Sequence, residues 1–272
     1  MLQIKNLTIT HIKDSRILLQ NLSFVLNFGD KAAIIGEEGN GKSTLLKLIY
    51  DESLVEDYVE YSGEIIRNQM NIGYLPQELP LEEKETTAYA FMCESPLFYE
   101  TDTRELVQIS RKLNIPIEMF YSEQLLGQMS GGEKIKLQLA RLLINKSDVL
   151  LLDEPSNDLD IDTVEWLETF IRECQIPVLY ISHDEVLLEN TANMIIHLEQ
   201  IKRKMQSRVT VSKRGYREYV NQRNNNLAHQ EQVARKERSD YAKQQEKFRQ
   251  IQQKVEHQQN VITRQDPHGV TT

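Results

Sequence analysis

Gly36-Glu-Glu-Gly-Asn-Gly-Lys-Ser-Thr44 is the most informative segment of the chain. It matches the phosphate-binding loop Gly-x-x-x-x-Gly-Lys-Ser, and it lies between an apolar strand over residues 31–35 and a helical pattern that begins at Leu45. The glycines let successive backbone N–H groups face one anion, and the following helix adds the positive end of its dipole. The segment predicts a nucleotide site in which Lys42 reaches the β- and γ-phosphates and Ser43 ligates Mg²⁺.

Two adjacent carboxylates, Asp153 and Glu154, follow the apolar run over residues 149–152. A strand without polar positions is typical of a parallel sheet that is covered on both faces. We expect Asp153 to hold Mg²⁺ through water and Glu154 to polarise an attacking water. Two solvated acids at a strand end would give the same pattern, but the phosphate-binding loop favours the catalytic interpretation.

Gln77 and His183 also follow predicted strands, over residues 71–75 and 178–181. In open parallel sheets, ligands bind at the carboxyl ends of the strands. An isolated Gln or His is more often structural. Here both are expected at the same edge of the sheet as Asp153, which favours a role in binding.

The segment Ser130-Gly131-Gly132-Glu133 opens an amphipathic helix predicted over residues 133–145. The segment fits a capping box, with Ser130 as the N-cap and Glu133 three residues later. It also fits a second anion-binding turn, because bare glycine N–H groups at a helix N-terminus bind phosphate. Both interpretations can hold together. Because the loop at Lys42 already encloses one ATP, the second turn implies a second copy of the domain.

The alternation of strands and helices predicts an α/β fold with a mainly parallel sheet. Strands over residues 2–9 and 22–28 have no helix between them, so an antiparallel N-terminal patch is expected. A helical subdomain is expected over about residues 80–140. Residues 194–211 are expected to be closing strands with a polar turn near Gln206.

The charge distribution and the hydrophobic spacing both change near the C-terminal end of the sequence. The net charge of −9 argues against a protein that wraps duplex DNA. Residues 213–272 nevertheless hold 12 Lys and Arg against 7 Asp and Glu, which makes this part basic. A series of apolar residues recurs there every seven positions, namely Leu227, Ala234, Tyr241, Phe248 and Val255.

This spacing predicts a long, coiled-coil-like linker helix over residues 213–272, although a single helix lying on its own domain would show the same stripe. A loop-like segment, Asp266-Pro-His-Gly269, follows near the end. We therefore expect the chain to be part of a longer protein. Cys93 and Cys174 lie outside any Cys-x-x-Cys pattern, and no run of 18 apolar residues occurs, so a cytoplasmic location with reduced thiols is expected.

In their order over residues 1–212, these motifs resemble the ABC (ATP-binding cassette) ATPase family. The resemblance implies a P-loop NTPase (RecA-like) fold, ATP and Mg²⁺ as cofactors, and an ATP hydrolysis that needs a second ABC domain. It implies that Gln77 senses Mg²⁺ and the γ-phosphate, that His183 contacts the γ-phosphate, and that Asp160 couples the two sites. The signature residues Ser130, Gly131, Gly132 and Glu133 would meet the nucleotide of the opposite domain. The nucleotide would be bound by Gly36, Gly39, Asn40, Gly41, Lys42, Ser43 and Thr44, with His11 beside the base. The metal would be held by Ser43, Gln77 and Asp153. The catalytic residues would be Lys42, Gln77, Glu154 and His183.

Glu133 and the segment Glu154-Pro-Ser-Asn-Asp-Leu-Asp160 are similar to the ABC-F group, as is Gly215-Tyr216-x-x-Tyr219 before the basic helix. Proteins of this group bind the ribosome, and some protect it from antibiotics. The resemblance implies a first ATPase domain with the start of an interdomain linker, a second ABC domain in the same polypeptide, and ribosomal RNA as a partner. The alternatives are the ATP-binding subunit of a membrane transporter, whose pore would be on another chain, and a nucleotide-gated interaction module with little turnover.

The sequence departs from the family pattern at three positions. Met129 replaces the usual Leu before the signature, which is a mild apolar change. Asp158 replaces His, which puts the contact across the dimer in doubt. His11 stands where an aromatic side chain stacks on adenine, so base selectivity is in doubt, and a surface role for His11 is an equal alternative.

Overall fold

The computed structural model describes residues 1–201 and 206–265, with side chains described through Val255. The chain forms two compact units, Met1–Tyr219 and Val220–Thr272, which are described separately. The first unit carries all the predicted nucleotide-binding motifs.

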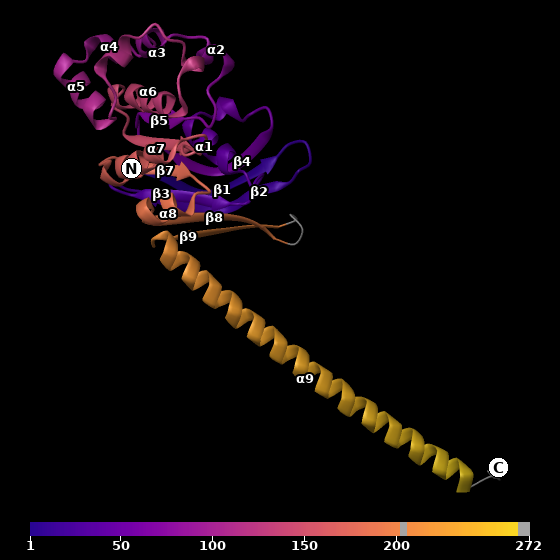
Figure 1. Cartoon of the computed structure of the whole chain (residues 1–272). Coiled ribbons are helices and arrows are strands. Elements are labelled where there is room, and N and C mark those ends of the chain that lie inside the picture. The colour runs from indigo at the N-terminus through magenta and orange to yellow at the C-terminus, as the bar shows by residue number, and fades with distance from the viewer. Residues whose placement is uncertain (202–205, 266–272) are drawn as a thin grey trace. The chain divides into compact units, whose positions relative to one another are not determined.

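The first unit is built on a six-stranded sheet in the order β5-β6-β7-β3-β8-β9 (Figure 1). Neighbouring strands from β5 to β8 run parallel, and β9 runs antiparallel to β8. Every residue of β6 and β7 is buried, as expected for strands covered on both faces. The strands are β3 (Lys31–Gly36), β5 (Ile72–Leu75), β6 (Val149–Asp153), β7 (Val178–Ile181), β8 (Met194–Ile201) and β9 (Gln206–Ser212).

The predicted antiparallel patch is a separate three-stranded sheet in the order β2-β1-β4. It consists of β1 (Leu2–His11), β2 (Ile17–Leu26) and β4 (Val59–Ile66). β2 lies earlier in the chain than predicted, because its residues from Ile17 onward pair with β1. The sequence does not predict β4, since the middle of this strand is exposed and shows no apolar alternation.

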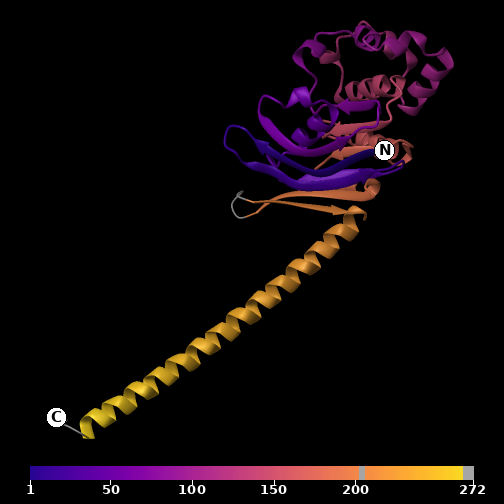
Figure 2. The same ribbon diagram turned by 180° about the vertical axis from the view of Figure 1, so that it is seen from behind.

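The helices flank the parallel sheet or form the subdomain. α1 (Lys42–Tyr50), α7 (Ile161–Glu173) and α8 (Glu185–Thr191) follow β3, β6 and β7. The subdomain helices gather at one end of the first unit in both views (Figures 1 and 2). They are α2 (Leu81–Lys84), α3 (Ala88–Cys93), α4 (Pro96–Glu100), α5 (Thr103–Lys112) and α6 (Gly131–Ile144), with 3₁₀ turns at Ile117–Tyr121 and Leu126–Gln128; a further 3₁₀ turn, Glu52–Leu54, follows α1. The predicted α/β fold class with its helical subdomain is therefore confirmed.

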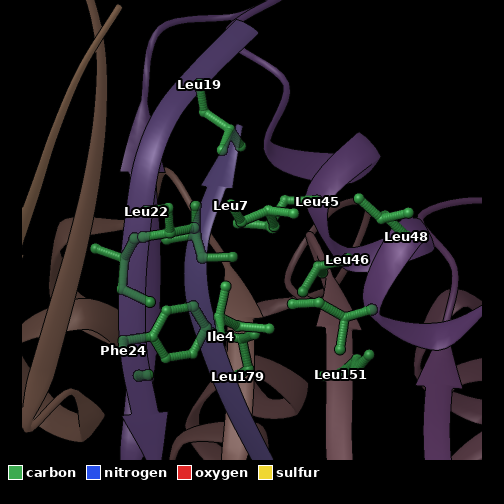
Figure 3. Close-up of a cluster of buried hydrophobic side chains, with 14 of the residues drawn as sticks. Ile4, Leu7, Leu19, Leu22, Phe24, Leu45, Leu46, Leu48, Leu151 and Leu179 are labelled. Carbon is green, nitrogen blue, oxygen red and sulfur yellow. The ribbon is translucent and has the colours of Figure 1, made fainter. Parts of the chain in front are cut away.

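The main hydrophobic core joins the two sheets. Side chains from β1, β2, α1, β6 and β7 meet in one cluster of buried residues (Figure 3). Leu45 and Leu46 of α1 are fully buried there, as is Leu151 of β6. The core therefore fixes α1 against β6, which brings the phosphate-binding loop toward the end of the strand that carries Asp153.

Replacing Leu151 with Ala is expected to lower the free energy of unfolding by about 2–5 kcal/mol, because a fully buried leucine leaves a cavity behind. Urea denaturation of the chain measures this change. Leu81→Ala is the matched control, since Leu81 is 80% exposed and its removal is expected to change stability by less than about 0.5 kcal/mol. An equal loss in both variants would contradict the assignment of Leu151 to the core.

α9 (Tyr216–Gln265) is the long helix expected after the first unit. Its first turn belongs to the first unit, where Tyr219 is buried and its hydroxyl lies 2.8 Å from Nδ1 of His197. In the second unit the apolar stripe is exposed, at Leu227, Val233, Tyr241, Phe248, Ile251 and Val255. Within the described residues, no helix has the length and hydropathy that crossing a membrane requires.

The sequence analysis also made predictions about the turn near Gln206, the segment over residues 266–269 and the boundary after residue 212. The closing strands predicted over residues 194–211 are β8 and β9, and Gln206, where a turn was expected nearby, pairs with Ile201 as the first residue of β9. The loop-like segment over residues 266–269 lies outside the described residues. The predicted boundary after residue 212 stays a prediction.

Candidate functional site

The loop after β3 requires glycine for backbone reasons. Gly39 and Gly41 have φ angles of 77° and 84°, in the left-handed region that favours glycine. At Gly36, a Cβ atom would lie 2.2 Å from the carbonyl oxygen of Leu198 in β8. Gly41 is the N-cap of α1 and supplies no side-chain cap, so the first-turn N–H groups of α1 remain available to an anion.

Two buried polar side chains hold this loop. Asn40 is 1% exposed, and its Nδ2 donates a hydrogen bond of 3.0 Å to the Leu198 carbonyl oxygen. Nζ of Lys42 donates to the carbonyl oxygens of Gly36 (2.8 Å) and Glu37 (3.0 Å). Burial lowers the pKa of the Lys42 ammonium, and nearby carboxylates oppose this shift. The loop thus presents a desolvated cation together with oriented backbone dipoles.

Asp153 lies at the end of β6 and connects this strand to the loop. Its Oδ1 accepts a hydrogen bond of 2.9 Å from Ser43 Oγ, and its Oδ2 accepts one of 3.3 Å from the Tyr74 hydroxyl. Burial raises the pKa of Asp153, while the Ser43 hydrogen bond lowers it. Paired hydroxyl and carboxylate oxygens suit Mg²⁺, which takes its remaining ligands from water and substrate phosphates.

Glu154 has a backbone φ of 50°, which costs a residue with a side chain roughly 1–2 kcal/mol. Its Oε2 accepts hydrogen bonds from Gln77 Nε2 at 3.1 Å and from Asn157 Nδ2 at 2.6 Å. Nε2 of His183 lies 3.7 Å from Glu154 Oε1. The two amides therefore fix the orientation of this carboxylate, and the His183 imidazole lies near its other oxygen.

One cavity of about 550 Å³ brings together most of the residues predicted to bind phosphate or to act in catalysis. Its lining consists of Glu38, Gly39, Gly41, Lys42, Ser43, Thr44, Gln77, Glu154 and His183. The lining residues come from the segments after β3, β5, β6 and β7 and from the start of α1, because the carboxyl ends of parallel strands share one edge of the sheet. Sequence reasoning missed Asn157, although its position three residues after Glu154 was a usable signal.

The signature residues do not line this cavity. They form the predicted capping box at the start of α6, in which Ser130 Oγ accepts from the Glu133 N–H and the Ser130 N–H donates to Glu133 Oε2. A Cβ at Gly131 would lie 2.7 Å from the Asp158 carbonyl oxygen, and one at Gly132 would lie 2.7 Å from Thr163 Oγ1. Close packing of α6 therefore also requires these glycines, and their contact with a second nucleotide stays a prediction.

Asp160 and His11 also lie outside the cavity lining. Asp160 caps α7, accepting 2.9 Å and 3.0 Å hydrogen bonds from the backbone N–H and hydroxyl of Thr163, which hold its pKa below the usual range. His11 ends β1, and its Nδ1 lies 2.8 Å from Asp14 Oδ1. The coupling role of Asp160 and the base-stacking role of His11 remain predictions.

A family model described as "ABC transporter" matches residues 19–157. The ATP-binding protein Uup of Buchnera aphidicola is 33% identical over 188 residues, covering 67% of this chain and 30% of that protein. The ribosome protection protein VmlR of Bacillus subtilis is 35% identical over 196 residues, covering 71% and 33%. Elongation factor 3 of Pneumocystis carinii is 31% identical over 195 residues, covering 70% and 17%. The chain spans a third or less of the length of these relatives.

Solved structures show the same fold. A nucleotide-free ATP-binding cassette from an ABC transporter superimposes with a TM-score of 0.62 at 19% identity, over 81% of this chain and 94% of the cassette. A bacterial ABC transporter cassette solved as a dimer gives a TM-score of 0.59 at 22% identity, over 79% of this chain and all of the cassette. At this level of identity the likeness concerns the fold alone.

Proposed function

The chain belongs to the ABC transporter family of ATPases, and from this premise we propose that it is the first ATPase domain of an ABC-F type protein whose binding to the ribosome is controlled by ATP. The observation that carries the ATPase role is the position of Glu154. Its carboxylate lines the same cavity as Lys42 and Ser43, and it is oriented by Gln77 and Asn157. Such an arrangement places a base opposite a phosphate-binding loop.

In this proposal each side chain has a defined task. The N–H groups of the loop and Lys42 bind the β- and γ-phosphates. Ser43 and Asp153, with Gln77, hold Mg²⁺, which counters the charge of the triphosphate. Glu154 orients the attacking water and accepts its proton, and His183 contacts the γ-phosphate from the next strand end. The fixed orientation of the Glu154 carboxylate keeps its free oxygen available to that water.

We propose that full turnover needs a second ABC domain. The signature residues at the start of α6 do not line the cavity of Lys42 and Ser43, which supports this proposal. A second cassette arranged head to tail would supply the missing donors, and a related fold has been solved as a dimer. Closure of the pair on ATP would then change the geometry of the linker that follows.

The ribosome is the partner we infer from the relatives and from the linker. VmlR is named as a ribosome protection protein and elongation factor 3 as a translation factor. Residues 213–272 carry an excess of cations over anions, and α9 exposes most of its side chains in the described part. Exposed Lys and Arg on such a helix suit the phosphate backbone of RNA. In some ABC-F proteins, binding to the ribosome protects it from antibiotics. Because ribosomes are the inferred partner, we also propose a cytoplasmic location.

The intact polypeptide that contains this chain is expected to sediment with ribosomes at low salt and to be released as salt rises, because each Lys or Arg that pairs with a phosphate displaces counterions. Changing Lys236, Lys243 and Lys247 of α9 to Gln should weaken binding to the ribosome. The slope of log K against log salt concentration should also become shallower, by about 0.7–0.9 for each lysine that no longer pairs with a phosphate. Sucrose-gradient sedimentation at several salt concentrations measures both effects.

The matched control changes three exposed lysines of the first unit, Lys5, Lys13 and Lys146, to Gln and should leave sedimentation unchanged. Equal weakening by both sets would show that the linker has no special role. Finding the polypeptide only in complex with a membrane permease would establish the transporter alternative instead.

A further inference from the structure

The turn between β1 and β2 contacts the phosphate-binding loop through one side chain. Nη2 of Arg16 donates a 3.2 Å hydrogen bond to the carbonyl oxygen of Gly39. Arg16 is half-buried, and its Nε is buried without a hydrogen-bond partner within the described residues. The guanidinium therefore lies against the loop.

The turn holds Arg16 in place through Asp14. Oδ1 of Asp14 accepts a 3.2 Å hydrogen bond from the Arg16 backbone N–H and lies 2.8 Å from His11 Nδ1. The backbone N–H of His11 donates to the Arg16 carbonyl oxygen at 2.9 Å, which closes the turn. These bonds connect His11, the residue expected beside the base, to the residue that contacts the phosphate loop.

The composition of the loop makes a nearby cation valuable. Glu37 and Glu38 stand within the phosphate-binding segment, and Glu38 lines the cavity. A carboxylate beside a bound triphosphate repels it, and a partly desolvated site strengthens this repulsion. Lys42 supplies one buried cation from α1. Arg16 adds a second cation, which is half-buried.

We propose that Arg16 is a positioning residue for the triphosphate: it fixes the Gly39 carbonyl oxygen, so that the neighbouring N–H groups face the phosphates, and it offsets the charge of Glu38. The proposal rests on the proposed function, since it requires that the cavity binds ATP. The proposal predicts that loss of Arg16 weakens the binding of any triphosphate, whether or not the ligand carries a base. Asp14 supports Arg16 but does not itself meet the nucleotide.

The test measures dissociation constants of the 272-residue chain for MgATP and for inorganic tripolyphosphate by calorimetry. Arg16→Ala is expected to weaken both ligands by about tenfold, the effect of one charge-assisted hydrogen bond. Arg16→Lys, which keeps the charge, should recover most of the loss. Adding Glu38→Gln to Arg16→Ala should recover about threefold, because it removes the repulsion that Arg16 offsets.

Lys13→Met is the matched control, since it removes one exposed cation from the same turn without contact to the loop. It should leave both constants unchanged. If Lys13→Met and Arg16→Ala weaken binding equally, or if Arg16→Ala affects MgATP but not tripolyphosphate, the proposal is wrong. Equal binding by Arg16→Ala and the unaltered chain also overturns it, whereas failure of the unaltered chain to bind either ligand overturns the proposed function itself.

Thermal unfolding without ligand separates this role from a merely structural one. Arg16→Ala should unfold near the temperature of the unaltered chain, because Arg16 lies on a turn outside the buried cores. If Arg16→Ala unfolds early, Arg16→Lys decides the outcome. A stable Arg16→Lys chain with full loss of tripolyphosphate binding would contradict the charge-offset part of the proposal.

Discussion

Changing Glu154 to Gln is expected to lower ATP turnover by the paired domains by about 10²–10⁴-fold while ATP stays bound. The amide keeps the shape of the side chain and can still contact Asn157, but it cannot accept a proton from the attacking water. Gln77 and Asn157 both donate to Glu154 Oε2, so two hydrogen bonds fix the orientation of this carboxylate. The strained backbone at Glu154 further indicates that the surrounding structure enforces its position.

Phosphate release by the intact polypeptide measures this effect, together with a separate measurement of ATP affinity. Glu165→Gln is the control, because Glu165 is an exposed carboxylate on α7 away from the cavity lining. It should leave the rate unchanged. A Glu154→Gln protein with an ordinary rate would remove Glu154 from the role of general base, and a lost affinity for ATP would make its role one of binding.

Changing Lys42 to Ala is expected to weaken nucleotide binding by about 100-fold or more, and turnover with it. Lys42 is 6% exposed, so its ammonium would interact with the phosphates in a site that is partly shielded from water. Two charge-assisted hydrogen bonds to phosphate oxygens are together worth about 3 kcal/mol or more. Burial lowers the Lys42 pKa, which means that the folded protein already bears the cost of keeping this cation dehydrated.

The expected loss is therefore one of binding and not of folding. Equilibrium binding of MgATP measures it, and thermal unfolding without nucleotide should show a midpoint close to that of the unaltered chain. Lys47→Ala, on the same helix but outside the cavity lining, is the control and should bind MgATP normally. Undiminished capture of nucleotide by Lys42→Ala would refute the assignment of the phosphate-binding loop.

The α/β fold class and the phosphate-binding loop were predictable from contiguous residues. Local sterics allow the left-handed backbone at Gly39 and Gly41. The capping box at Ser130 depends on hydrogen bonds within three residues. The apolar strand before Asp153 is likewise a local pattern, and the parallel sheet follows from the alternation of strands with helices. Short-range physics of this kind can be inferred from the order of residues alone.

Contacts between distant segments were not accessible in this way. Ser43 and Asp153 are 110 residues apart, and only the family resemblance placed them together, as ligands of one metal ion. Arg16 and Gly39 are 23 residues apart, and no pattern in the sequence indicates their hydrogen bond. Strand β4 pairs with β1, but its central residues are exposed. Its sequence therefore has no apolar alternation from which a strand could be predicted. The signature glycines were predicted for their N–H groups, whereas the structure adds a packing reason, the close approach of α6 to Asp158.

The linear order of residues therefore established the family of chemistry, a phosphate cradle with carboxylates at the strand ends, because those features arise within single turns and strands. The packing of α1 and the two sheets established which side chains meet across the cavity. Side-chain contacts at about 3 Å depend on how whole helices and strands are placed relative to one another. The buried core sets this placement through hydrophobic packing, which is non-directional and leaves no local pattern in the sequence.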